Sequence, residues 1–568
     1  MVGDSSKPHN LLSSLLSVGS TVIVTSLAIT GIIMGLRTLG SLEGLELAAF
    51  DQLIRMRPDE GPDNRFLIVG INDVDIQTRK EYPIQDGTLA KVLAKLEEHE
   101  PRVIGVDILR DVPQGAAAGR AELVKRLSQG DRIVAACVVS KADSPGIAAA
   151  PGIPEDRVGV ADFPVDAGGI VRQGMVITIP QASKLPAANQ HICNYANAEN
   201  QLPSLSFQMA VRYLEAKGIE AKLTKSGEIQ FNSTVIKRLS PNASGYRNAN
   251  TGDYQILLNY RSAKNVAKQV SISDILADKV DPALIKDKIV MIGYTAPIVK
   301  DDFYTPYSGA AQDSQKMPGV AVHVQNASQI LSAVLDQRSL FWYWDQWQEN
   351  VWIFAWSLVG GFLAWRIRKP WLLILGTGVA IAGLFGSAYI IFLQAGWIPL
   401  IPPALGLLIT AVGVVLIDRY AATIVKTVKG FLKINIEIDE AKKDAEVAAI
   451  AESDYFLELQ QKAKDLRNRD NKEVSPTATT PIVTDNLESN NLSLQEVIDI
   501  PKTSQPIAEI DYLQQVRDRR NQLNLQQNNT DTNNLETSQT QTTVEDQEEI
   551  EYLQQLQRRG KKLRETEK

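Results

Sequence analysis

The sequence predicts an α/β domain outside a membrane, four transmembrane α-helices and a mostly disordered cytoplasmic tail. Three observations lead to this fold class. Four apolar runs approach or reach the length that crosses a bilayer. The residues between the first run and the second alternate short β-branched stretches with amphipathic helical patterns. The end of the chain is rich in Asn, Gln, Ser and Thr, which cannot bury enough surface to fold.

The first transmembrane helix is expected at residues 16–36, after a cytoplasmic N-terminus of residues 1–15. No charged residue lies between Asn10 and Leu36. At about 1.5 Å per residue, this run spans a hydrocarbon core of about 30 Å. A secretory signal peptide is the alternative, but its apolar region is about 7–15 residues long, which favours a retained helix.

Three further transmembrane helices are expected at residues 350–365, 371–393 and 398–417. Tryptophans cluster at the start of the first, as at a membrane interface, and no charged residue lies between Pro370 and Ile417. Basic residues at 366–369 and after Arg419 indicate cytoplasmic loops, so residues 37–349 are expected outside. The chain is therefore predicted to be a multi-pass protein of the inner (cytoplasmic) membrane with a periplasmic domain.

Within the external region, strands and helices alternate in the order typical of a parallel α/β sheet. Residues 152–172 and 224–252 look like loop-rich insertions. Strands are expected at residues 66–71, 102–109, 132–139, 254–260 and 286–295, and helices at residues 87–98, 121–127, 204–214 and 320–335.

Acidic residues follow three of these strands, at the edge where an open α/β sheet binds ligands. Asp301 is also in the third of these loops. Such a cluster suits a cation or a polyol, amine or amino-acid-like ligand. The alternative is that these residues are helix caps and turn formers. The candidate ligand-binding residues are Asp73, Asp75, Asp107, Arg110, Asp302 and Thr305.

The external region offers no evident nucleophile–base pair, so we expect no enzymatic activity, no cofactor and no metal site. Carboxylate-only hydrolysis would need a bound metal and is a minor alternative. Cys137 and Cys193 both lie in the external region, where a disulfide is favoured over two buried thiols. His323 has an apolar setting that favours a structural histidine over a ligand.

The external region and the membrane part resemble the CHASE2 sensor domain of bacterial, notably cyanobacterial, receptors. The resemblance implies a periplasmic sensory domain, ligands that are generally undefined, and a dimer. One departure is Gly168, which stands where the family's D-x-D-G motif has its second Asp. Among the matching stretches are FDQLIRMRP (50–58), FLIVGINDVDI (66–76), RVIGVDILRDVP (102–113), VGVADFPVDAGGIVRQ (158–173), KDKIVMIGYTAPIVKDDFYTPYS (286–308) and MPGVAVHVQNASQIL (317–331).

The cytoplasmic part is expected to be a charged helix over residues 418–470 and a disordered tail over residues 471–568. Only two glycines, Gly430 and Gly560, and no histidine follow Ile417, which excludes P-loop, kinase, diguanylate cyclase and phospho-histidine modules. The charged helix is as compatible with a dimerising coiled coil as with a single helix. An acidic–Tyr-Leu-Gln-Gln pattern recurs in the tail and predicts helical docking segments, whose apolar faces are Tyr512, Leu513 and Val516, and Tyr552, Leu553 and Leu556.

These features predict a receptor-like protein that binds an external small molecule or protein and relays the signal to a separate cytoplasmic protein effector. A homodimer is compatible with this layout, and no nucleic acid is expected as a partner. The alternative is an envelope scaffold that links the periplasm to cytoplasmic machinery.

Overall fold

The computed structural model describes residues 9–166, 168–309, 316–418, 458 and 461–464. Side chains are described from residue 21 onward. Most of the expected charged helix at 418–470 and all of the expected tail at 471–568 lie outside the described residues. The same holds for the predicted docking residues Tyr512, Leu513, Val516, Tyr552, Leu553 and Leu556.

The centre of the α/β domain is a six-stranded sheet in which every pairing is parallel, as the sequence predicts. Its strand order is β11-β1-β12-β2-β3-β4. The inner strands are apolar on both faces because helices cover both sides of the sheet. The strands are β1 (Phe66–Ile71), β2 (Val103–Asp107), β3 (Ile133–Cys137), β4 (Val158–Val160), β11 (Lys268–Ser271) and β12 (Ile289–Tyr294).

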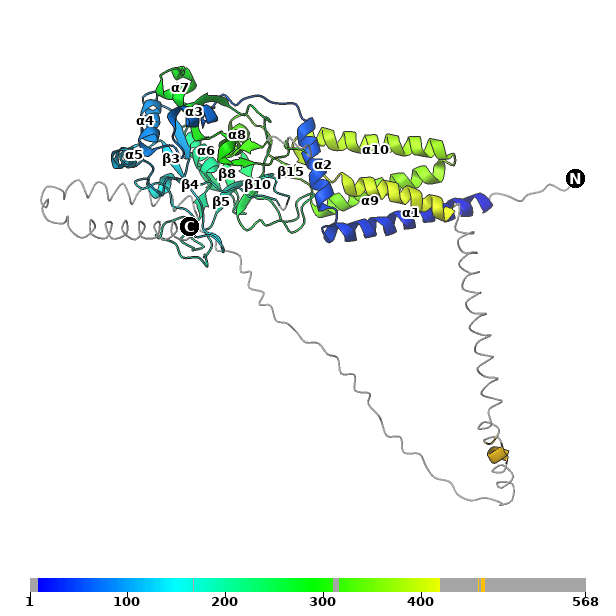
Figure 1. Ribbon diagram of the computed structural model, residues 1–568. Coiled ribbons are helices and arrows are strands. Elements are labelled where there is room, and N and C mark those ends of the chain that lie inside the picture. The colour runs from blue at the N-terminus through cyan, green and yellow to red at the C-terminus, as the bar shows by residue number, and fades with distance from the viewer. Residues whose placement is uncertain (1–8, 167, 310–315, 419–457, 459–460, 465–568) are drawn as a thin grey trace, which may run out of the picture.

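Two helical layers enclose this sheet (Figure 1). The strand residues Leu67, Val69 and Ile104 pack on one face against α4 (Asp86–Glu97), α5 (Ala117–Gln129) and α7 (Ile272–Leu276). On the other face Phe66, Ile68 and Val103 pack against α6 (Leu205–Glu215) and α8 (Gly319–Leu335). The short helix α3 (Asp73–Arg79) follows β1 directly.

The two stretches that look like loops in the sequence also contain strands. Residues 152–172 contain β4, the edge strand of the main sheet, and residues 224–252 contain two strands of a small antiparallel sheet. The additional strands are β5 (Gln173–Thr178), β6 (Leu202–Pro203), β7 (Ala221–Leu223), β8 (Ile229–Phe231), β9 (Thr234–Ile236), β10 (Tyr254–Leu257), β13 (Asp302–Phe303) and β14 (Met317–Pro318). Short 3₁₀ turns lie at η1 (Glu155–Arg157), η2 (Pro282–Leu284) and η3 (Pro297–Val299).

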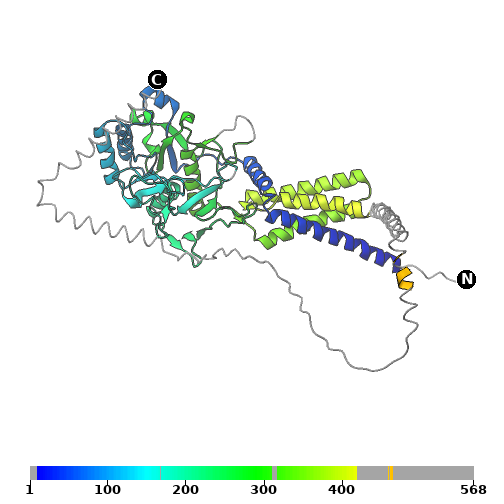
Figure 2. The same cartoon turned by 60° about the horizontal axis from the view of Figure 1, so that its bottom comes forward.

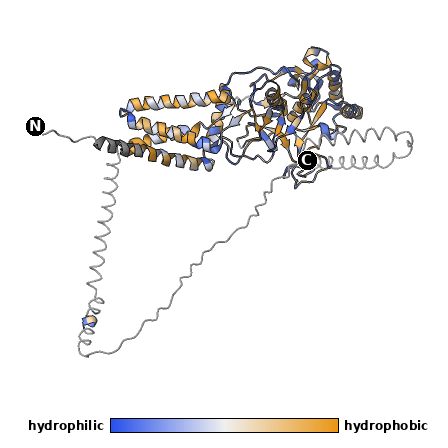
Figure 3. Ribbon diagram, turned by 180° about the vertical axis from the view of Figure 1, so that it is seen from behind, coloured by the Kyte–Doolittle hydropathy of each residue, from blue (hydrophilic) through white to orange (hydrophobic). Residues whose placement is uncertain are grey.

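Four long helices form a bundle at one end of the domain, as Figures 1 and 2 show. They are α1 (His9–Thr38), α9 (Gln346–Arg366), α10 (Pro370–Leu393) and the last helix, Ile401–Asp418. Three of them, Thr21–Thr38 within α1, α10 and the last helix, are long and apolar enough to cross a membrane. The bundle is correspondingly apolar in Figure 3. The polar first turn, tryptophans and glycines of α9 lower its hydropathy, so the fourth span stays a prediction.

The helix α2 (Glu43–Met56) lies at the junction between the domain and the bundle (Figures 1 and 2). Its apolar face packs against Tyr246 of the domain and against Phe392 and Trp397 of the bundle. A two-residue parallel pairing of β15 (Trp342–Tyr343) with β16 (Gly396–Trp397) joins the same two parts. The junction is therefore a continuous packed layer.

Candidate ligand site at the carboxyl edge of the sheet

The carboxyl ends of β12, β2, β3 and β4 face one pocket of about 510 Å³. This volume lies in the range of small-molecule sites. Because the strands are parallel, their ends bring together residues that are distant in the sequence. The lining includes three aspartates, a histidine and several aromatic rings. It consists of Tyr82, Pro83, Asp107, Ile108, Leu109, Arg110, Gln114, Val138, Ala161, Asp162, Phe163, Tyr294, Val299, Asp301, Phe303 and His323.

Asp107 and Asp301 are the two carboxylates without a compensating cation. Asp107 ends β2 beside Gly293 of β12, and Asp301 lies just before β13. Burial, and then the charge of Asp301, hold the pKa of Asp107 well above its usual value. Burial, and then the charge of Asp302, raise the pKa of Asp301. Two carboxyls that both resist ionisation are typical of functional sites.

His323 of α8 completes this group. Its side chain is only 1% exposed, and neither ring nitrogen has a partner in full hydrogen-bond geometry among the described residues, although the Ala161 backbone lies near the ring. Its Nε2 lies 3.7 Å from Oδ1 of Asp107, and its ring centroid lies 4.3 Å from that of Phe163. Burial lowers the pKa of His323 to about 3, against a smaller opposing effect of the Ala161 backbone. The imidazole is therefore neutral at physiological pH and has unused hydrogen-bonding capacity.

A glycine lets the start of α8 approach the acidic pair closely. A Cβ atom on Gly319 would lie 2.9 Å from Oδ1 of Asp301 and 3.1 Å from the ring of Phe303. Phe303 in turn packs edge-on against Phe163, with ring centroids 5.0 Å apart. The pocket therefore combines an acidic pair with an aromatic wall. Within the described part of the chain, no three His, Cys, Asp or Glu side chains are placed to hold a metal ion.

The structure brings two of the six predicted ligand residues, Asp107 and Arg110, into this pocket. The Arg110 guanidinium is directed away from the acidic pair. It donates to the Ile84 carbonyl at 2.6 Å, and its Nε lies 3.3 Å from Asp86 Oδ1. The guanidinium of Arg110 is thus already paired, although the residue contributes to the lining of the pocket.

The other four predicted residues do not line the pocket. Asp75 forms a capping box with Asn72 and accepts from Ser273, so it stabilises the start of α3, whose first residue is Asp73. Asp302 pairs with Lys316 at 3.0 Å. Thr305 closes a turn, with its backbone N–H donating to Ser308 at 3.0 Å. Asp75 and Thr305 thus have the capping and turn roles that the sequence offered as the alternative, whereas Asp302 lies in β13 as the partner of Lys316.

Sequence reasoning placed Asp301 in the acidic cluster without choosing it as a ligand residue, and it passed over His323 as a ligand and the aromatic wall. Asp301 was visible as the neighbour of Asp302, but nothing in the sequence distinguished which of the two faces inward. His323 was assigned a structural role because of its apolar setting. Its unpaired nitrogens, which argue otherwise, depend on tertiary contacts.

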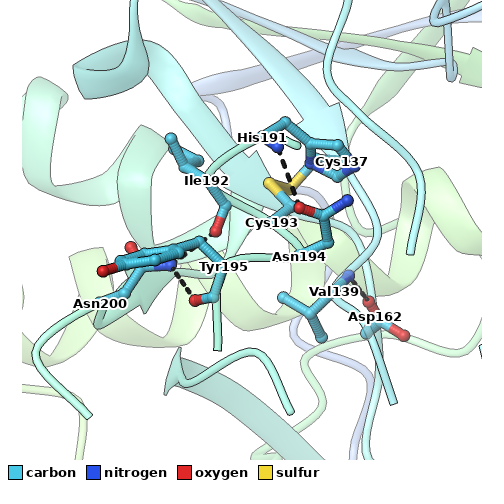
Figure 4. Close-up of a disulfide and its surroundings, with 9 residues drawn as sticks. All are labelled: Cys137, Val139, Asp162, His191, Ile192, Cys193, Asn194, Tyr195 and Asn200. Atoms are coloured by element: carbon cyan, nitrogen blue, oxygen red, sulfur yellow. Dashed lines mark hydrogen bonds between the residues drawn. A yellow bond between two sulfur atoms is a disulfide. The ribbon is translucent and has the colours of Figure 1, made fainter. Parts of the chain in front are cut away.

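A disulfide joins Cys137, at the end of β3, to Cys193, as the sequence favoured. Their Cα atoms are 6.5 Å apart and their sequence separation is 56. Figure 4 shows the bond among the loops around it. Ser140 donates to the Cys193 carbonyl at 2.8 Å, and Asn200 donates to the Ile192 carbonyl at 2.6 Å. Residues 179–201, which form no helix or strand, are thereby tied to β3 beside the pocket.

A buried polar cluster connects the domain to α2. Arg172 donates to both carboxylate oxygens of Asp51 at 2.7 Å and to Asp166 at 2.6 Å. Tyr246 also donates to Asp166, at 2.8 Å. Burial alone would lower the pKa of Arg172, but Asp51 and Asp166 raise it above its ordinary value. The loop in which Gly168 departs from the family motif thus supplies Asp166 as an anchor for α2.

Glu46 of α2 makes the corresponding contact with the bundle. It is buried, and its two carboxylate oxygens accept from the backbone N–H groups of Leu400 at 2.7 Å and Ile401 at 2.8 Å, at the start of the last helix. Burial raises the pKa of Glu46, although these two N–H groups oppose the shift. A carboxylate at a helix N-terminus satisfies unpaired donors. The helix α2 therefore binds the domain through Asp51 and the last helix through Glu46.

Together, the fold and the pocket define a class of protein: an α/β domain with a pocket at the carboxyl edge of its sheet, whose chain leaves one helix of an apolar bundle and returns through another. The chain belongs to the CHASE2 domain family, which it matches over residues 27–362, more than half of its length. CHASE2 is a family of extracellular sensor domains. No curated protein and no solved structure matches the chain.

Proposed function

We propose that this chain is a membrane receptor whose periplasmic CHASE2 domain binds a small ligand in the Asp107–Asp301 pocket. In this proposal the ligand shifts the conformational equilibrium of the domain, and α2 passes the change to the membrane helices. The cytoplasmic tail then passes it to a separate effector protein. The observation that carries the proposal is the pocket itself, with two uncompensated carboxylates and an unpaired buried imidazole. Buried polar groups without partners are costly unless a ligand satisfies them.

The proposal includes α9 as a fourth span. At about 1.5 Å per residue, its 21 residues reach about 31 Å, the thickness of a hydrocarbon core. It packs closely between its neighbours through small residues, as membrane helices do. Thr30 of α1 donates to Ser357 at 3.2 Å, and a Cβ on Gly361 would lie 2.9 Å from Val22. With four spans, the basic residues at 366–369 lie on the cytoplasmic side.

The contacts of α2 support the proposed relay. A shift of the loop that carries Asp166 would act on α2 through Arg172, and a shift of α2 would act on the last helix through Glu46. A ligand shifts such an equilibrium only by its differential affinity for the two states. The relay needs no catalytic step in this chain, and we propose that the repeated tail segments recruit the effector.

Reporter fusions test the topology on which the proposal rests. Alkaline phosphatase fused after residue 150 should be active, and a fluorescent protein that matures only in the cytosol should be bright after residues 367 and 418. A dark fusion at 418 with an active phosphatase there would mean three spans, which would put the tail outside. That result would overturn the relay to a cytoplasmic effector.

Proximity labelling from the tail tests the relay. The alanine variant of Tyr512, Leu513, Tyr552 and Leu553 should lose cytoplasmic partners that the wild-type chain labels. Alanine at Gln514 and Gln554, next to the proposed apolar faces, is the matched control and should keep them. Fixed septal or polar localisation with unchanged partners in both variants would favour the scaffold alternative.

A further inference from the structure

The pocket at the carboxyl edge of the sheet has a specific charge imbalance. Its two other charged pairs are closed: Arg110 faces Asp86 at 3.3 Å, and Lys141 faces Asp162 at 2.7 Å. Neither Asp107 nor Asp301 is paired with a lysine or arginine among the described residues, and the histidine beside Asp107 is neutral. The unmet requirement of the pocket is therefore a positive charge that can donate to two carboxylates.

The other walls limit what kind of cation fits. A hard metal ion takes six or more oxygen ligands, and the described side chains do not provide a metal-binding group. The rings of Phe163 and Phe303 instead offer apolar contact and, for a cation, a favourable π-face. Tyr82 and Tyr294 pack edge-on with centroids 6.3 Å apart and extend this aromatic lining. Such a wall accommodates carbon rather than the hydration shell of an ion.

His323 provides one more polar contact. The neutral imidazole has one donor and one acceptor nitrogen; the Ala161 backbone can engage only one of them, which leaves at least one available to a ligand. Its position against Phe163 and 3.7 Å from Asp107 places it between the aromatic wall and the acidic pair. A hydroxyl or amide on the ligand could therefore bind there.

From these observations we infer that the pocket binds a small organic monocation, a primary amine on a compact carbon skeleton, with its ammonium group between Asp107 and Asp301. The skeleton lies against Phe163 and Phe303. An ammonium has three donors, enough for both carboxylates and one further acceptor. This inference rests on the proposed receptor function, because it names the ligand class for the same site.

The test uses the full-length protein in detergent micelles and three matched pairs of probes: propylamine and propanol, phenethylamine and 2-phenylethanol, and cyclohexylmethylamine and cyclohexylmethanol. Each pair shares its carbon skeleton and differs in the charged group. Binding is measured by thermal shift and by isothermal titration calorimetry. At least one amine should bind about 10- to 100-fold more tightly than its alcohol, as expected for a charge-assisted hydrogen bond inside a pocket.

Neighbouring aspartates supply the matched variants. Asp301→Asn should reduce amine affinity about 10- to 100-fold. Asp302→Asn, next in sequence but paired with Lys316, should leave amine affinity within about threefold of the wild type. Asp107→Asn should also abolish amine binding while raising the melting temperature of the free protein, because it removes a carboxyl whose ionisation burial and Asp301 disfavour. A merely structural aspartate would lower that temperature.

Three outcomes overturn the inference. These are the absence of binding by all three amines, equal binding of amines and alcohols, and binding of Ca²⁺ alone that is lost in Asp301→Asn, which would indicate a metal site. These failures can be distinguished from failure of the receptor proposal. If the reporter fusions and the tail labelling succeed while the amines fail, the receptor stands and only the ligand class is wrong.

Discussion

Removal of the Cys137–Cys193 disulfide should destabilise the domain by about 4 kcal/mol. Replacing both cysteines with serine deletes the cross-link without leaving a free thiol. The bond joins residues with a sequence separation of 56. In the chain-entropy treatment, closing a loop of that length removes about 14 cal/mol/K from the unfolded chain, or about 4 kcal/mol at 25 °C.

Without the disulfide, the segment around it should unfold before the rest of the domain does. The cluster that buries the bond is small and consists of short aliphatic side chains, with Val139, Val158, Val160 and Leu202 as its other buried members. It therefore provides little other packing to hold residues 179–201, which form no helix or strand. We expect this segment to open first, and the pocket wall at Val138 to loosen with it.

Urea unfolding and hydrogen exchange of the full-length protein in micelles measure both effects. Wild type should lose the same stability after reduction, which makes the reduced wild type the matched control. A double-serine variant within about 1 kcal/mol of the wild type, with equal protection of residues 179–201, would refute the reasoning. Maleimide labelling in intact cells adds a second check, because free thiols there would indicate a reducing compartment and contradict the proposed topology.

Three further predictions concern buried polar groups. Glu46→Gln keeps one carbonyl acceptor for two backbone donors, so it should cost about 1.5–3 kcal/mol in urea unfolding, whereas the exposed Glu122→Gln should cost less than about 0.5 kcal/mol. Arg172→Gln leaves two buried carboxylates without their cation and should cost about 3–5 kcal/mol, with equal unfolding midpoints refuting that role. The pKa of His323 in the folded protein is about 3, so the unfolded state binds a proton more readily. The wild type should therefore lose about 2 kcal/mol of stability relative to His323→Gln between pH 6.5 and 5. The pocket carboxyls Asp107 and Asp301 titrate in both proteins, so their contributions largely cancel, and parallel pH profiles of stability would contradict this prediction.

The sequence predicts best the strands and helices whose own residues show a clear apolar pattern. The strands β1 and β12 are buried along their whole length because helices cover both faces, and α8 shows a long helical pattern. The apolar pattern of a strand does not indicate which strands lie next to it in the sheet. The strand β12 inserts between β1 and β2 although it is about 180 residues further along the chain, and only long-range packing selects that place.

In the candidate site, the sequence likewise does not indicate which individual residues face the pocket. Lys300 adopts a left-handed conformation with φ of 60° just before Asp301, and it ends the η3 turn. That reversal accompanies the placement of Asp301 in the pocket and of Asp302 at Lys316. A glycine would have marked the reversal, but lysine gives no such signal. Asp107 could be predicted, since it ends a clear strand, whereas Asp301 could not.

One ion pair links the two helices through which the chain enters and leaves the α/β domain. Arg37, near the end of α1, binds both Glu349, in the first turn of α9, and the Ser244 carbonyl of the domain, and the glutamate is fully buried. Pulling one helix along the other would separate an ion pair shielded from water, at a cost of about 3–5 kcal/mol. Sliding of α1 past α9 is thus strongly opposed, whereas the two helices can tilt or rotate together without breaking the Arg37–Glu349 ion pair.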